Sequence, residues 1–190
     1  MCGIAGFIDK NRKLQSGEKR ELILKMIQSI EHRGRDGHGV FVSEDVVIGH
    51  ARLSILDLSE NGAQPLSDTT GNIILSYNGE IYNYHDLNVT LEKKYKLKSK
   101  CDTETLLYSY IERGEGCLLG IKGMFAFSLY DRRQKTLILA VDRFSIKPLY
   151  YIDTPDWFAW GSEIKSLFFL PGVCAELYPT KISEYLLFRQ

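Results

Sequence analysis

The second residue of the chain, Cys2, is the strongest candidate for a nucleophile in this sequence. Methionine is removed efficiently when the next residue is small, so we expect the mature chain to begin at Cys2, with a thiol and a free α-amine on one carbon. An α-amine has a pKa of about 7.7–8.0, so part of it is unprotonated near neutral pH and can accept the thiol proton, directly or through one water. This chemistry needs no histidine. A cysteine at position two is on its own more often an accident, so the case depends on the residues that follow.

Four further residues carry groups whose chemistry can be described from their types alone. Asn78 and Gly79 pair an amide NH₂, which donates without titrating, with a residue that allows close backbone approach. Arg52 carries a guanidinium fork that matches a carboxylate, although a structural ion pair is the usual fate of a lone arginine. Asp102 precedes a helical pattern, and the local sequence alone predicts that it is the helix N-cap.

Hydrophobic periodicity and turn residues predict the elements that must position these groups. Apolar residues at helical spacing indicate a helix over 18–31, and further helices are predicted at 86–94, 103–113 (ending at Gly114), 163–169 and 180–188. Apolar runs bounded by turn signals predict strands at 3–8, 39–43, 46–54, 73–77, 124–130, 137–141, 149–152 and 157–160. Strands, then helices, then strands again predict an α+β fold with largely antiparallel sheets.

Composition narrows the class of protein. The 190 residues fit one domain, and 24 basic residues balance 24 acidic ones, so no charge excess favours nucleic acid or an anionic membrane. The four cysteines are far apart, which argues against a metal site or a disulfide framework and favours a reducing, cytoplasmic location. The N-terminus lacks the basic region of a signal peptide, and no apolar run reaches the ~18 residues that span a bilayer.

Several motifs in order resemble the class II glutamine amidotransferases, which are N-terminal nucleophile hydrolases. They are the segments 2–7 (CGIAGF), 32–34 (HRG), 50–55 (HARLSI), 77–83 (YNGEIYN), 101–104 (CDTE) and 142–151 (DRFSIKPLYY). Within that group the chain looks like the glutaminase domain of glutamine-hydrolysing asparagine synthetases. The resemblance implies a four-layer α/β/β/α sandwich and covers residues 2–190.

The resemblance also implies roles for individual residues. Cys2 would attack the side-chain amide of L-glutamine and form a γ-glutamyl thioester, and Asn78 and the backbone N–H of Gly79 would stabilise the oxyanion. Arg52 would hold the substrate α-carboxylate, and Asp102 and Glu80 would face its α-ammonium group. Backbone groups near Leu53 and Ile55 would also touch substrate.

In asparagine synthetases a second domain follows, which uses ATP and magnesium to activate aspartate and receives ammonia through a tunnel. Its Ser-Gly-Gly-x-Asp-Ser loop does not occur here. We therefore expect a truncated chain whose domain needs no metal or other cofactor and whose partner is a synthetase domain of the full-length protein. A homodimer, a different ammonia acceptor such as a surface sugar, and a non-catalytic binding domain remain alternatives.

The sequence departs from the family pattern at two positions. Arg35 stands where the family usually has proline after His-Arg-Gly, and Ser145 stands where it usually has glycine after Asp-Arg-Phe. Loss of proline loosens a turn. Serine is costly at position 145 if the backbone there has a positive φ.

Overall fold

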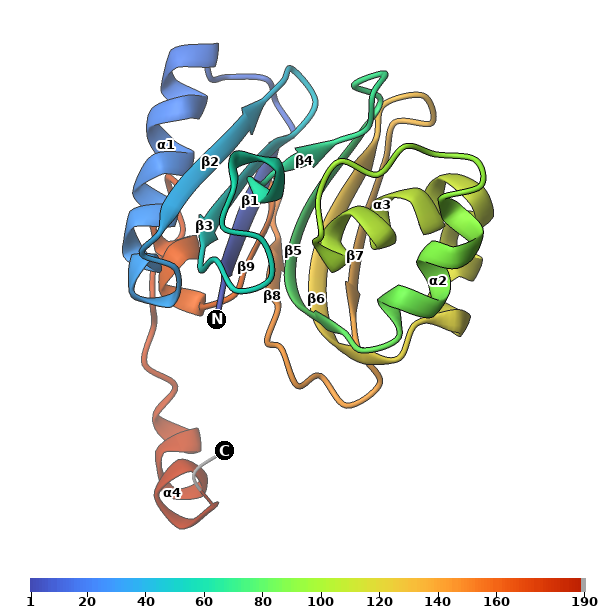
Figure 1. Cartoon of the computed structure of the whole chain (residues 1–190). Coiled ribbons are helices and arrows are strands. Elements are labelled where there is room, and N and C mark those ends of the chain that lie inside the picture. The colour runs from blue at the N-terminus through green and yellow to red at the C-terminus, as the bar shows by residue number, and fades with distance from the viewer. Residues whose placement is uncertain (189–190) are drawn as a thin grey trace.

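The computed structural model describes residues 1–188 and contains two antiparallel β-sheets that face each other (Figure 1). We call them sheet A, in the order β2-β3-β1-β9-β8, and sheet B, in the order β4-β5-β6-β7. The strands of sheet A are β1 (Gly3–Asp9), β2 (Gly37–Val42), β3 (Val47–Arg52), β8 (Tyr150–Asp153) and β9 (Trp157–Gly161). Those of sheet B are β4 (Leu66–Ser67), β5 (Ile73–Ile81), β6 (Gly123–Asp131) and β7 (Thr136–Val141).

Helices cover the two outer faces of this pair of sheets. Figure 1 shows α1 (Ser16–Ser29) against sheet A, and α2 (Tyr84–Leu91) and α3 (Asp102–Arg113) against sheet B. The last helix, α4 (Pro179–Phe188), extends away from the four layers, and its apolar side chains are exposed. Short 3₁₀ helices occupy Glu31–Arg33, Glu60–Gly62, Gly114–Gly120 and Ile164–Phe169. The predicted α/β/β/α sandwich is confirmed.

Three apolar clusters fill the spaces between the layers. Alternate residues of a strand face opposite sides of its sheet, so each strand can contribute to two of them. Ala5, Phe7 and Val47 pack against α1, whereas Leu75 and Phe127 pack against α2 and α3. The cluster between the sheets contains Val46, Ile48, Ile74, Tyr130 and Trp160.

The predicted elements are all present, but some boundaries differ in ways that matter for the site. The helix predicted at 18–31 begins at Ser16, where Gln15 and Glu18 form a reciprocal cap, and the one predicted at 86–94 begins at Tyr84. The strand predicted to end at residue 77 continues to Ile81 because β6 pairs with it along its whole length. Asn78, Gly79 and Glu80 therefore belong to a paired strand instead of the loop after one.

Strand register brings the start of the chain beside β5. Gly3 pairs with Ala51 of β3, which places Cys2 next to Arg52 at one end of these two neighbouring interior strands of sheet A. His50 hydrogen-bonds Ser76 across the space between the sheets, so Arg52 and Asn78, each two residues further along, also face that space. Cys2 and Arg52 thus meet Asn78 from opposite sheets.

Candidate active site

All eight residues predicted for the site line a single cavity of about 80 Å³ at one end of the space between the sheets. They are Cys2, Arg52, Leu53, Ile55, Asn78, Gly79, Glu80 and Asp102. They come from the start of β1, the end of β3 and the loop after it, the second half of β5, and the first residue of α3. The fold therefore gathers segments that lie up to a hundred residues apart in the sequence.

The Cys2 thiol is fixed by the segment that follows β3. Its Sγ accepts a hydrogen bond from the Leu53 backbone N–H at 3.4 Å and lies 3.6 Å from the Leu53 carbonyl oxygen. Burial raises the pKa of the Cys2 thiol, and the Leu53 hydrogen bond and nearby positive charges only partly offset this. A thiol of raised pKa is protonated at neutral pH, so a nucleophilic role for Cys2 requires a base.

The backbone of Cys2 is anchored separately from its thiol. Arg33 donates from Nε to the Cys2 carbonyl oxygen at 3.0 Å, and its Nη1 lies 3.1 Å from Glu163 Oε1. His32 Nε2 is 2.8 Å from the same carboxylate oxygen. Arg33 therefore holds the backbone of Cys2 directly, and Glu163 holds both Arg33 and His32 in place.

Arg52 joins the site to the loop between β3 and β4, residues 53–65, which we call the covering loop. Its Nη2 donates to the carbonyl oxygens of Asp57 at 2.6 Å and Ser59 at 2.9 Å. A β-carbon on Gly62 would lie 2.7 Å from the same Nη2, so glycine lets this loop fold back onto Arg52. A guanidinium has five N–H donors, and those not used by the loop can bind an anion.

Asn78 and Gly79 are positioned by the pairing of β5 with β6. The Asn78 side chain is buried, and its Nδ2 has no hydrogen-bond acceptor among the described residues. Since an unpaired buried donor costs free energy, this NH₂ group is suited to bind an incoming oxygen. A β-carbon on Gly79 would lie 2.4 Å from the Met124 carbonyl oxygen, so glycine is needed here for the approach of β6. The close approach predicted for Gly79 is thus to a neighbouring strand, and its contact with substrate remains a prediction.

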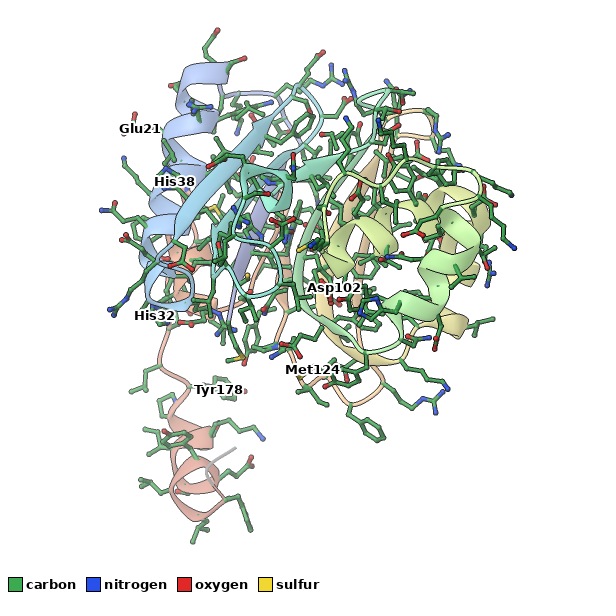
Figure 2. All side chains as sticks on the ribbon, in the orientation of Figure 1. Glu21, His32, His38, Asp102, Met124 and Tyr178 are labelled. Atoms are coloured by element: carbon green, nitrogen blue, oxygen red, sulfur yellow. The ribbon has the colours of Figure 1, made fainter. Side chains whose placement is uncertain are left out.

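Asp102 is not the helix N-cap that the local sequence predicted. Cys101 occupies the cap position of α3, and the Asp102 carboxylate turns toward β5. Asp102 Oδ2 accepts hydrogen bonds from the Tyr77 hydroxyl at 2.7 Å and the Ile81 N–H at 2.8 Å. Burial raises the pKa of Asp102, and these two bonds partly offset that effect. Figure 2 shows Asp102 at the end of α3 nearest the strands, where a buried carboxylate can bind a cation.

A model of the family described as "Glutamine amidotransferase domain" matches residues 1–190. The chain belongs to this family. It is 44% identical over 168 residues to glutamine-hydrolyzing asparagine synthetase 1 of Bacillus subtilis, which covers 88% of this chain and 26% of the relative. It is 36% identical over 187 residues to glutamine-hydrolyzing asparagine synthetase B of Escherichia coli, which covers 98% of this chain and 33% of the relative. This glutamine amidotransferase domain is therefore homologous to the glutaminase part of those enzymes and spans about a quarter to a third of their length.

Solved structures confirm the fold of this amidotransferase domain. The glutamine phosphoribosylpyrophosphate amidotransferase of B. subtilis, solved with ADP and GMP, superposes with a TM-score of 0.72 at 22% identity over 87% of this chain and 43% of that one. A structure described as the allosteric regulatory enzyme of purine biosynthesis gives a TM-score of 0.71, also at 22% identity, over 88% of this chain and 43% of that one. At this identity the likeness concerns the fold alone.

The amidotransferase site contains groups that sequence reasoning did not place there. Lys147 is buried, and its Nζ lies 3.1 Å from Met1 Sδ. Gln64 accepts from the Tyr77 N–H at 2.7 Å and donates to Thr103 Oγ1 at 3.3 Å, which joins the covering loop to β5 and α3. The motif around Lys147 was visible in the sequence, but only the loop geometry turns that side chain inward.

The loop that carries Lys147 explains the departure at Ser145. The Asp142 carboxylate accepts backbone N–H bonds from Phe125, Phe144 and Ile146, which forces a tight turn. Ser145 within it has φ of 51°, in the left-handed region that favours glycine. The predicted cost of serine at this position therefore has a structural basis.

Two further features of the described residues concern metal ions and membranes. Among residues 1–188, no group of three histidine, cysteine or acidic side chains is arranged to hold a metal ion. Within the same range no helix combines the length and apolar character needed to cross a bilayer.

Proposed function

We propose that this domain hydrolyses the side-chain amide of L-glutamine to glutamate and ammonia, with Cys2 as nucleophile after removal of Met1. The observation that carries the proposal is the convergence on one cavity of the Cys2 thiol, the unpaired Asn78 amide, the Arg52 guanidinium and the Asp102 carboxylate. A thiol and an amide donor suit acyl transfer, and a separated cation and anion suit the two ends of an amino acid.

The chemistry follows from the raised pKa of the thiol. The free α-amine of Cys2 takes the thiol proton while Sγ forms a bond with the amide carbon of glutamine. The Asn78 NH₂ and the Gly79 N–H donate to the oxyanion that develops. The amine then returns the proton to the nitrogen, ammonia leaves, and water cleaves the resulting thioester to give glutamate. The backbone nitrogen of Cys2 cannot accept this proton while it is in a peptide bond with Met1.

Substrate binding divides between the two sheets. Arg52 pairs with the α-carboxylate, and Asp102 with the α-ammonium group, whose charge repays the cost of the buried carboxylate. Glu80 is half-buried in the same cavity and adds negative charge on the ammonium side. Leu53 contributes backbone groups beside the thiol, and Ile55, whose side chain is 62% exposed, contributes backbone groups from the covering loop.

For the full-length protein, we propose that the ammonia is used by an ATP-dependent synthetase domain that converts aspartate to asparagine. The relatives named asparagine synthetase support this acceptor. A different acceptor stays an alternative, since a protein named amidase chry2 from Gibberella zeae is also 35% identical over 87% of this chain. We assign ATP and magnesium to the acceptor domain and none to this one. A homodimer and a cytoplasmic location stay predictions.

Covalent labelling tests the proposed nucleophile. The protein is treated with a glutamine analogue that carries a chloroketone in place of the amide, and intact mass and peptide mapping locate the adduct. We expect one adduct on Cys2 of a chain that lacks Met1, together with release of glutamate and ammonia from glutamine. Protection by glutamine should slow the labelling.

Cys101 provides the matched control because it lines the same cavity and is also only partly buried. Cys101→Ser should retain labelling and glutamine hydrolysis, whereas Cys2→Ala should lose both. Adducts spread over Cys101, Cys117 and Cys174, or none at all, would instead favour a binding domain that keeps the fold without the chemistry.

A further inference from the structure

The nucleophile and the groups proposed for the oxyanion hole belong to different sheets. Cys2 and Arg52 lie at one end of the interior strands β1 and β3 of sheet A, whereas Asn78 and Gly79 lie in β5 of sheet B. Most of the space between the sheets is filled by the apolar cluster around Ile48, Ile74 and Trp160. Apolar contact is non-directional, so it fixes the alignment of the two faces less sharply than a hydrogen bond does.

One hydrogen-bonded bridge crosses this space directly below the site. Ser76 Oγ lies 3.0 Å from His50 Nδ1 and 3.2 Å from the Gly49 carbonyl oxygen, and both side chains are fully buried. Within residues 1–188, these two bonds are the only ones with both partners in strands of opposite sheets, and a further bond joins the Tyr130 hydroxyl of β6 to Asp45 in the turn between β2 and β3 at 3.0 Å. We call the two bonds of Ser76 the His50–Ser76 bridge.

The hydrogens of the bridge can be assigned by counting donors. A serine hydroxyl has one proton, and the Gly49 carbonyl can only accept, so Ser76 donates to Gly49 and His50 Nδ1–H donates to Ser76. Both the neutral and the protonated ring carry this Nδ1–H, and the complete burial of His50 favours the neutral form, with no proton on Nε2. The bridge is directional at both ends, unlike the apolar contacts beneath it.

The bridge stands one layer below the reacting groups. His50 precedes Arg52 by two residues on β3, and Ser76 precedes Asn78 by two residues on β5, so each pair shares a face. At a rise of roughly 3.3 Å per residue, the bridge is about 7 Å from the site. A shift of one sheet along the other at the bridge would be carried almost unchanged to Cys2 and Asn78.

We propose that Ser76 is a positioning residue: through His50 and Gly49 it sets the alignment of the two sheets that brings the Asn78 donor to the oxyanion formed at Cys2. This inference rests on the proposed glutaminase function. Ser76 touches no reacting atom, and its effect reaches the site through β5. A misplacement on the order of 1 Å can cost roughly 10²-fold in rate, so a small loss of alignment has a large kinetic consequence.

Ser128 offers a control of the same residue type in the same layer. It pairs with Ser76 in the register of β5 and β6, is fully buried, and its Oγ has no hydrogen-bond partner among the described residues. Ser128→Ala therefore removes a buried hydroxyl without breaking a contact between the sheets. Ser76→Ala removes the same group and breaks the bridge.

The test measures kcat per active site, counted by titration with the chloroketone analogue of glutamine. Ser76→Ala should lower kcat per titrated site by roughly tenfold or more, with a smaller change in KM, and Ser128→Ala should stay within about twofold of wild type. Ser76→Thr, which keeps the hydroxyl, should recover most of the lost rate. A variant that merely folds less well would lose titrated sites and keep its kcat per site.

Variants at His50 give a second route to the same answer. His50→Asn keeps an N–H donor near the position of Nδ1 and should retain most of the rate, whereas His50→Leu should match Ser76→Ala. The double variant His50→Leu/Ser76→Ala should be no slower than either single one, because both break the same bridge.

Two outcomes overturn the inference: a wild-type kcat per site in Ser76→Ala and His50→Leu, or an equal loss in Ser128→Ala. Failure of the analogue to label wild-type Cys2 would instead reject the proposed function.

Discussion

Acid should destabilise this domain in large part through His50. Burial between the sheets holds the pKa of His50 down to about 3, from an ordinary value of 6.5. In the unfolded chain this imidazole takes up a proton below about pH 6.5, but in the folded domain it stays neutral until about pH 3. The unfolded state therefore binds more protons in this range, and the free energy of unfolding falls as the pH is lowered.

The size of the effect follows from the two pKa values. The contribution of the neutral His50 ring to the free energy of unfolding is fully present above pH 6.5. About 2 kcal/mol of this free energy is lost at pH 5, and about 3 kcal/mol is lost at pH 4. For a domain of this length, a loss of 2 kcal/mol corresponds to a fall in Tm of roughly 4–8 °C.

The measurement compares urea unfolding at pH 7 and pH 5 for wild type and His50→Asn. Removing the ring has a cost that does not depend on pH, so this cost cancels when each protein is compared with itself. The stability lost between the two pH values should be about 2 kcal/mol smaller in His50→Asn than in wild type. His38→Asn is the control, because His38 is exposed on the α1 side of the molecule, away from Asp102 (Figure 2). Equal losses in wild type and His50→Asn would refute the reasoning, as would a reduced loss in His38→Asn.

Three substitutions test other parts of the structure. Asn78→Ala should lower kcat by about 10²–10³-fold with little change in the KM for glutamine, and steady-state rates that match wild type would exclude Asn78 from the oxyanion hole. Arg52→Lys should raise KM far more than it lowers kcat, since an ammonium lacks the fork that matches a carboxylate; an unaltered KM would contradict this role. Ser145→Gly should increase the free energy of unfolding in urea by about 0.5–1 kcal/mol, because it relieves a positive φ; a loss of stability would show that the serine side chain makes a contact worth more than the strain.

Local sequence predicted most of the secondary structure, and together with the family motifs it made Cys2 the candidate nucleophile. The helical spacing of Leu22, Ile23, Met26 and Ile27 predicts α1 because one apolar stripe must face a sheet, and these residues do pack against sheet A. Cys2 could be proposed because its base would be its own α-amine, which depends on its covalent position, and because the motifs that follow it resemble those of the family.

Local sequence misjudged the residues whose role depends on a distant partner. The strand pattern ended β5 at Tyr77, because Asn78, Gly79 and Glu80 have low strand propensity, but pairing with β6 carries the strand to Ile81. Asp102 has the ordinary signature of a helix cap, and only the position of Tyr77, 25 residues earlier, turns its carboxylate into a buried group of the site.

The tertiary structure decided how these groups meet. The sequence supplied the candidate side chains for glutamine hydrolysis, because its motifs resemble those of the family and because a thiol beside an α-amine, an amide donor and a guanidinium fork have their chemistry wherever they lie. Whether Cys2 faces Asn78 depends on how one sheet sits on the other. That alignment is set by contacts such as the one between His50 and Ser76, which are 26 residues apart in sequence and meet only when both sheets are packed. Since directional bonds between the sheets join residues that have no local relation, no window of sequence can specify them.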